Sequence, residues 1–168
     1  NDHLFGGRGM DFLKGGDGKD RLEGGDDRDR LEGGNGNDAL FGGRGDDLLF
    51  DGRGSDVLTG GMGADIFSFD IFNTRTPFSQ DNYGGFNPND PAPIDTVTDY
   101  DSKEGDRLDF GISLGTDFDE LLSQSGRANM YQSGDDVMIE IYSQSMGSKE
   151  FAPNIGAGVV LDRLPVGT

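Results

Sequence analysis

A nine-residue repeat constrains this chain more than any other feature. From Gly6 to Ser68 the sequence divides into seven consecutive units, GGRGMDFLK, GGDGKDRLE, GGDDRDRLE, GGNGNDALF, GGRGDDLLF, DGRGSDVLT and GGMGADIFS. The opening NDHLF matches the end of an eighth unit, from which we expect a longer parent chain upstream. A fixed short period is typical of proteins built from stacked repeats.

Two positions of the unit never vary in type. Position six is always aspartate, and position eight is always a large apolar residue. The aspartates are Asp11, Asp20, Asp29, Asp38, Asp47, Asp56 and Asp65, and the apolar residues are Leu13, Leu22, Leu31, Leu40, Leu49, Leu58 and Phe67. Glycine at positions one, two and four fails only at Asp51 and Asp27. A flexible linker has no reason to keep an apolar residue at every ninth position, so the pattern favours a folded repeat.

The composition is that of a chain that cannot fold on hydrophobic burial alone. Only 32% of the 168 residues are hydrophobic, and 32 acidic against 14 basic residues give a net charge of −18. Such values lie near the disordered class, and the self-repulsion opposes a compact state. Either the chain is disordered or something cationic holds it together. The charge also argues against binding nucleic acid, and no apolar run is long enough to span a membrane.

The units resemble the G-G-x-G-x-D-x-U-x nonapeptide of RTX (haemolysin-type) proteins. The resemblance covers residues 1–68 and implies an all-β fold, a right-handed parallel β-roll (β-helix) that binds calcium. It also implies secretion from a Gram-negative bacterium through a type I system, with an uncleaved C-terminal signal, and hence an extracellular location. Residues 69–168 lack the period and are predicted to form a β-rich cap related to secretion. They resemble the extensions that follow the repeats in serralysin-type proteases and mannuronan C5-epimerase modules.

The physical chemistry of the unit fits calcium, a hard cation that takes six to eight oxygen ligands. Glycine opens backbone conformations closed to other residues and lets carbonyl oxygens converge. Positions seven to nine should form a short strand whose middle residue points inward. In the six-residue turn, positions one, three and five should serve one ion, and positions two, four and six another. Because each coil needs two units, an ion would lie between turns two units apart, and seven turns predict about five ions or more.

The predicted calcium ligands fall into three sets. The first set is the carbonyl oxygens of positions one, three and five: Gly6, Arg8, Met10, Gly15, Asp17, Lys19, Gly24, Asp26, Arg28, Gly33, Asn35, Asn37, Gly42, Arg44 and Asp46. The second is the carbonyl oxygens of positions two and four: Gly25, Asp27, Gly34, Gly36, Gly43, Gly45, Gly52, Gly54, Gly61 and Gly63. The third is the seven aspartates of position six. One such site would join Gly6, Arg8 and Met10 to Gly25, Asp27 and Asp29. Which turn supplies which set stays open.

The second half should contain strands at Ile94–Tyr100, Arg107–Phe110, Val137–Tyr142 and Gly158–Leu164, a loop over 73–93 and a short helix over Asp117–Gln124. We expect this half to cover the apolar outer positions of units 33–68, because exposed phenylalanine and leucine need a cover. Its acidic cluster from Asp95 to Asp109 is not an EF-hand, because Glu104 stands where that loop needs glycine. Solvated strands or turn caps are expected there in preference to a further calcium site.

No catalytic motif is present: the chain has one histidine and no cysteine, so HExxH and thiolate chemistry are excluded, and GxSxG and Walker A motifs are missing. We therefore expect a non-enzymatic, monomeric calcium-binding module, the C-terminal part of a larger secreted protein, whose partners are calcium, the upstream domain and the secretion apparatus. The alternative is an accessory module of an alginate epimerase-like enzyme, or of an adhesin, that contacts an anionic glycan. Ice binding ranks last, because the outer faces lack a Thr-x-Thr ladder.

Overall fold

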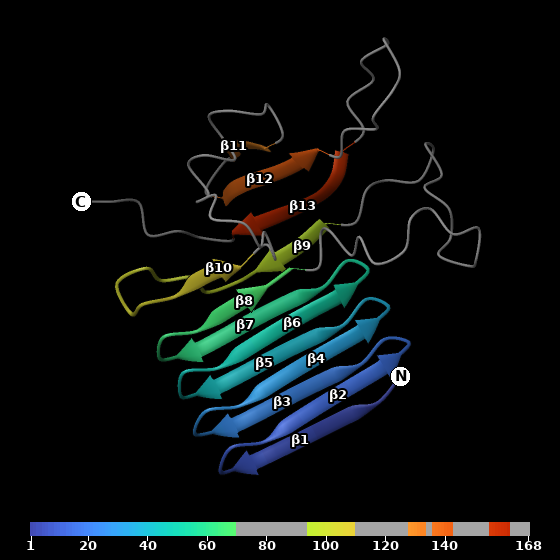
Figure 1. Cartoon of the computed structure of the whole chain (residues 1–168), viewed down its shortest axis with the longest axis vertical. Coiled ribbons are helices and arrows are strands. Elements are labelled where there is room, and N and C mark those ends of the chain that lie inside the picture. The colour runs from blue at the N-terminus through green and yellow to red at the C-terminus, as the bar shows by residue number, and fades with distance from the viewer. Residues whose placement is uncertain (70–93, 110–127, 134–135, 143–154, 162–168) are drawn as a thin grey trace.

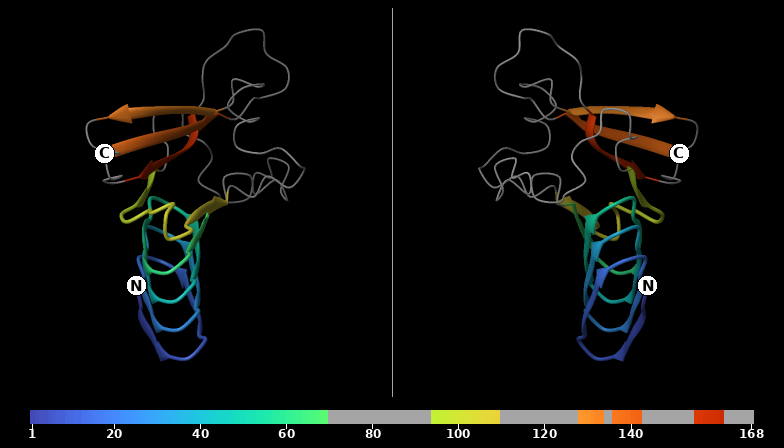
Figure 2. Two further views of the ribbon diagram at one scale, coloured as in Figure 1. Left: turned by 90° about the vertical axis from the view of Figure 1, so that its left-hand side faces the viewer. Right: turned by 90° about the vertical axis from the view of Figure 1, so that its right-hand side faces the viewer.

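The repeat forms a flattened roll of parallel strands. The structure is a computed structural model, and it describes residues 1–69, 94–109, 128–133, 136–142 and 155–161. All the regular elements within these ranges are strands, and those of the repeat stack coil upon coil in two facing sheets (Figures 1 and 2). The predicted all-β, parallel β-roll fold is confirmed. The predicted helix Asp117–Gln124 and loop 73–93 lie outside the described residues.

Consecutive strands of the repeat alternate between the two sheets. The strands are β1 (His3–Arg8), β2 (Phe12–Asp17), β3 (Arg21–Asp26), β4 (Arg30–Asn35), β5 (Ala39–Arg44), β6 (Leu48–Arg53), β7 (Val57–Met62) and β8 (Ile66–Ser68). Odd-numbered strands pair in one sheet and even-numbered strands in the other, all in parallel. Each residue pairs with the one two units later, as Leu4 does with Leu22 and Leu22 with Leu40. One coil therefore consists of two units, as predicted.

The strands are longer than the predicted three residues, because each continues through positions one to three of the next unit. Glycine makes this continuation possible. Gly7 pairs with Gly25, and a Cβ atom on Gly25 would overlap the Gly7 carbonyl oxygen of the coil below. Gly25 also has a φ of 123°, a conformation that side chains oppose. The absent side chains thus let successive coils approach at ordinary sheet spacing.

The core of the roll is a single column of apolar residues from position eight. The leucines of this column from Leu22 to Leu58 have no exposed surface, and neither has Phe67. Alternation along a strand directs position eight inward and positions seven and nine outward, as predicted. One large apolar residue per nine makes a thin core, so the roll has little hydrophobic burial for its length.

The second half extends both sheets. Its strands are β9 (Ile94–Val97), β10 (Arg107–Asp109), β11 (Ala128–Ser133), β12 (Asp136–Tyr142) and β13 (Ile155–Leu161). Strand β10 adds to β8, and β9 adds to β7 and is followed by β13, β12 and β11 in the same sheet (Figure 1). Four of these strands overlap the predicted segments, and β11 was missed. Strand β9 ends at Val97, and Asp99 beyond it accepts hydrogen bonds from the N–H groups of Gly60 and Gly61.

The predicted cover of the apolar outer positions of units 33–68 by the second half stays a prediction, because much of that half lies outside the described residues. Its described strands add to the ends of the two sheets. Within the repeat, arginines of the coil below contact two of the aromatic rings. The Arg21 guanidinium lies 4.0 Å from the centre of the Phe41 ring, and that of Arg30 lies 4.1 Å from the centre of the Phe50 ring. Charged side chains of the N-terminal units thus shield two aromatic rings of the units above them.

No helix that is long and apolar enough to cross a membrane occurs in the part of the chain that the structure describes.

Candidate metal sites

The position-six aspartates form two ladders that run the length of the roll. In each coil the backbone N–H of the aspartate donates to Oδ1 of the aspartate one coil later, at 2.6 to 2.9 Å. One ladder contains Asp2, Asp20, Asp38, Asp56 and Asp95. The other contains Asp11, Asp29, Asp47, Asp65 and Asp106. The repeat period therefore places one carboxylate per unit at a fixed corner of the roll.

The ladders continue into the second half through two residues that sequence reasoning did not place there. Asp95 and Asp106 occupy the next positions after Asp56 and Asp65, and both are buried, so the prediction of solvated strands is wrong for these two. Asp106 does act as the predicted turn cap, because its Oδ2 accepts the Asp101 N–H at 2.8 Å. The sequence does contain a signal. Asp95-Thr96-Val97 and Asp106-Arg107-Leu108 keep the Asp-x-apolar end of a unit, although the G-G-x-G pattern does not precede either of them.

The second oxygen of each repeat aspartate has no partner. Oδ2 is buried and accepts no hydrogen bond in all seven position-six aspartates of the full units. From Asp20 to Asp65 these residues are at most 3% exposed. A buried carboxylate oxygen without a partner costs free energy unless a proton or a cation reaches it. A calcium ion would satisfy this oxygen, and the donor set, a carboxylate beside glycine carbonyls, has the oxygen chemistry that calcium prefers.

The turns bring backbone carbonyl oxygens to the same corners. The position-three carbonyl faces the preceding coil: the Asp26 oxygen accepts from Gly9 N–H at 3.2 Å and that of Met62 from Gly45 N–H at 2.8 Å. The position-two carbonyl faces the following coil, where it lies against the next glycine, as Gly7 does against Gly25. Neighbouring carbonyls of a turn thus point to opposite coils. Which of them bind an ion stays a prediction.

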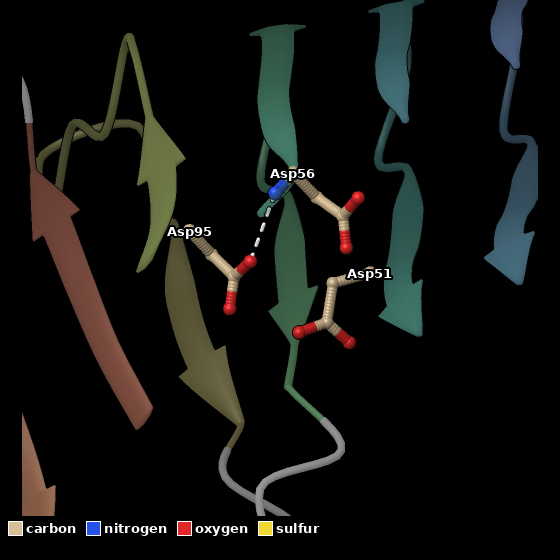
Figure 3. A group of neighbouring side chains, drawn as sticks. All are labelled: Asp51, Asp56 and Asp95. Carbon is tan, nitrogen blue, oxygen red and sulfur yellow. Dashed lines mark hydrogen bonds between the residues drawn. The ribbon is translucent and has the colours of Figure 1, made fainter. Parts of the chain in front are cut away.

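The two turns that depart from the glycine pattern behave differently. Asp27 has a φ of 79°, the one non-glycine residue with a positive φ among those described, and its carboxylate is exposed and accepts from Gly9 N–H. Asp51 is instead 3% exposed, and its carboxylate lies beside those of Asp56 and Asp95 (Figure 3). Asp27 therefore keeps the turn geometry, whereas Asp51 adds a buried charge.

Burial raises the pKa values of the aspartates toward the middle and upper coils. Burial raises the pKa of Asp29 and Asp38, that of Asp47 to about 6, and those of Asp56 and Asp65 to about 7. Neighbouring aspartates of the ladder add to the effect. Asp20 is the exception, because the Asp2 backbone N–H lowers its pKa. Without a cation, the interior of the roll therefore disfavours the charged form of these carboxylates.

A shallow groove crosses the outer face of the even-numbered sheet. Its lining includes Lys14, Asp17, Glu32, Asn35 and Phe50. The Lys14 ammonium lies 3.1 Å from the Glu32 carboxylate, so part of the positive charge is already paired. The groove offers an aromatic ring and mixed charges, and carboxylates in it oppose an anionic ligand.

Comparisons with known proteins agree with this geometry. The family model of the RTX calcium-binding nonapeptide repeat (4 copies) matches residues 1–31, 14–49 and 32–67. Among solved structures, the chain is similar to the AlgE6R3 subunit of the Azotobacter vinelandii mannuronan C5-epimerase, determined in solution. The TM-score is 0.53 at 28% sequence identity, and the match covers 88% of this chain and 72% of that one. A comparison with curated protein sequences found no match.

Proposed function

Because residues 1–67 belong to the RTX calcium-binding nonapeptide repeat family, we propose that this module folds when it meets calcium outside the cell, as the C-terminal part of a larger protein secreted by a type I system. Residues 69–168 would cap the roll. The observation that carries the proposal is the buried, unpartnered Oδ2 of every full unit. A roll with these oxygens empty of both proton and cation is strongly destabilised.

The physical reason for coupling to secretion is the difference in calcium between compartments. Repeat sites need their carboxylates deprotonated and their turns formed, so binding free energy becomes folding free energy. Scarce calcium inside the cell would keep the chain unfolded and able to pass through an export channel. Abundant calcium outside would fold it. About five ions between turns two units apart, held by the ligand sets predicted above, would contribute about ten positive charges to a half-chain of net charge −7.

Far-UV circular dichroism tests the proposal directly. We expect the β signal to appear cooperatively as calcium is added to chelator-treated chain and to vanish when chelator is restored. Equal β content with and without calcium at pH 7.5 would contradict it. Export is tested separately, by placing residues 1–168 behind a reporter in a strain with a type I exporter and measuring the reporter in the medium.

The similarity to an epimerase subunit favours one alternative, a non-catalytic accessory module that contacts an anionic glycan. The groove on the even-numbered sheet is where such a chain would lie, beside the Phe50 ring and the Arg30 guanidinium that lies over it. Its carboxylates weigh against a polyanion, so we rank this function second. Titration with alginate oligomers in the presence of calcium separates the two, because saturable binding that Phe50→Ala abolishes would support the glycan module.

A further inference from the structure

Asp51 stands where six of the seven units have glycine, at position one. This position lies directly beside the unpartnered oxygen of the same unit. A Cβ atom placed on Gly33 would lie 2.7 Å from Asp38 Oδ2. A side chain at position one is therefore forced toward the position-six carboxylate, which in unit six is Asp56. Asp51 brings a second carboxylate to a place where the other units leave room only for a hydrogen atom.

A third carboxylate reaches the same place from the second half of the chain. Asp95 on β9 accepts the Asp56 N–H at 2.9 Å through Oδ1 and is 4% exposed. One oxygen from each of Asp51, Asp56 and Asp95 lies within 4.8 Å of the other two (Figure 3). The three residues come from β6, from the turn before β7 and from β9, so a shared ligand would fasten the repeat to the strand that follows it.

Two observations point to a cation between these carboxylates. Asp56 Oδ2 is buried without a partner, and Asp56 is only 1% exposed. The Asp51 and Asp95 carboxylates are buried as well, and one oxygen of each lies within 4.8 Å of the other. Buried carboxylates this close repel one another unless a proton or a cation lies between them. Three buried negative charges make a divalent cation the better partner, since it compensates two of them and binds several oxygens at once.

We propose that Asp51, Asp56 and Asp95 bind one calcium ion through their side-chain carboxylates, at a site that shares Asp56 with the predicted repeat sites and adds two carboxylates to it. A repeat site as predicted contains one carboxylate among backbone carbonyls, whereas this site contains three. Residues 90–94 before Asp95 read DPAPI and lack the glycine turn of a unit. The Asp51 side chain thus supplies oxygen and charge where the repeat pattern stops. Higher ligand charge gives tighter calcium binding, so this site should fill first.

The test counts calcium ions and resolves their affinities, using the full chain. The variant Asp51→Gly restores the repeat consensus, and Asp95→Asn keeps the shape of the third ligand. Glu104→Gln is the control, because it removes one acidic charge from an exposed position outside the predicted ligand sets. Equilibrium dialysis with elemental analysis gives the stoichiometry, and isothermal titration gives the order of filling.

We expect each of the two site variants to bind one ion fewer than the wild type and to lose the tightest binding step, while Glu104→Gln keeps the full number of ions and the tightest step. Unchanged stoichiometry and an unchanged tightest step in Asp51→Gly would overturn the site and indicate a shared proton instead. Circular dichroism in excess calcium identifies a variant that fails to fold; if Asp95→Asn does so, Asp51→Gly decides. The inference rests on the proposed calcium binding, and the two fail differently: a wild type that binds no calcium refutes the function, whereas equal counts refute only this site.

Discussion

The repeat strands and the strands β12 and β13 differ in amino-acid composition. Strand β3 reads RLEGGD and buries one leucine, whereas β12 reads DVMIEIY and β13 reads IGAGVVL. The repeat strands run parallel with glycines in register, whereas β11 with β12 and β12 with β13 pair antiparallel, with one register shift between Ile141 and Tyr142. Short antiparallel strands rich in apolar residues can pair through burial alone. The repeat strands cannot, so their stability has to come from what fills their acidic corners.

The charge follows a different division from the apolar content. Residues 1–68 contain 15 acidic and 8 basic residues, a net charge of −7, and residues 69–168 contain 17 and 6, a net charge of −11. About five calcium ions would more than neutralise the first half. Part of the remaining acidity has a structural place, because Asp95 and Asp106 continue the ladders of the repeat. The second half thus completes corners that the repeat begins.

Removing calcium should separate the two regions most clearly. We expect amide protection in β3 to β7 to collapse on chelation, since four or more buried carboxylates would then be left uncompensated. Protection in β12 and β13 should fall less, because these strands are richer in apolar residues and contain none of the ladder aspartates. Hydrogen exchange followed by mass spectrometry measures both at once. An equal loss of amide protection in the two regions would show that they fold as one cooperative unit, and that calcium stabilises both alike.

A core substitution tests how much of the stability comes from the thin apolar column. Leu40→Ala should destabilise the calcium-loaded roll by about 2–5 kcal/mol, because Leu40 has no exposed surface and its neighbours are fixed by the coils above and below. The control Val57→Ala lies on an outer position that is 40% exposed and should cost under about 1 kcal/mol. Urea denaturation in saturating calcium measures both. Similar values would mean that the column is not the main core.

Removing one carboxylate of a ladder should weaken calcium binding without abolishing the fold. Asp38→Ala deletes an unpartnered buried oxygen together with the acceptor of the Asp20 N–H, so we expect calcium affinity to fall by about tenfold or more and cooperativity to decrease. The control Asp26→Ala removes an exposed side chain but keeps the backbone carbonyl that is the predicted calcium ligand. It should therefore bind calcium as the wild type does. Isothermal titration at pH 7.5 decides; equal affinities of the two variants would argue against carboxylate ligation.

The pH dependence of the calcium-free chain should be opposite to that of an ordinary acidic protein. Burial raises the pKa of Asp47 to about 6 and those of Asp56 and Asp65 to about 7 in the folded roll. A raised carboxyl pKa stabilises the folded state below the unfolded value near 4, and this stability is lost as the pH rises through 6 to 7. Circular dichroism in chelator should therefore show more β structure at pH 5 than at pH 8. Calcium should remove the difference, and a flat profile without calcium would contradict the burial of these groups.

The sequence determined the repeating part of this protein nearly completely. The nine-residue period, with aspartate at position six and an apolar residue at position eight, predicted the roll, the two-unit coil and the inward column, because each unit contacts only equivalent neighbours. The predicted strands were too short, because glycine pairs in a sequence indicate a turn. Only the stacking of one coil on the next shows that these glycines lie within strands. Strand β11 lacked a usable pattern and emerged only through pairing with β12.

Only the tertiary structure decided what happens where the period stops. Asp95 and Asp106 follow their ladder partners by 39 and 41 residues in place of 18, so no fixed spacing in the sequence connects them. The stacking of β9 on β7 and of β10 on β8 puts them in register, because sheet hydrogen bonds act between neighbours in space. The same packing turns Asp51 from an irregularity of the repeat into the partner of two buried carboxylates. Local sequence thus set the chemistry of each corner, and the stacking of coils set which corners meet.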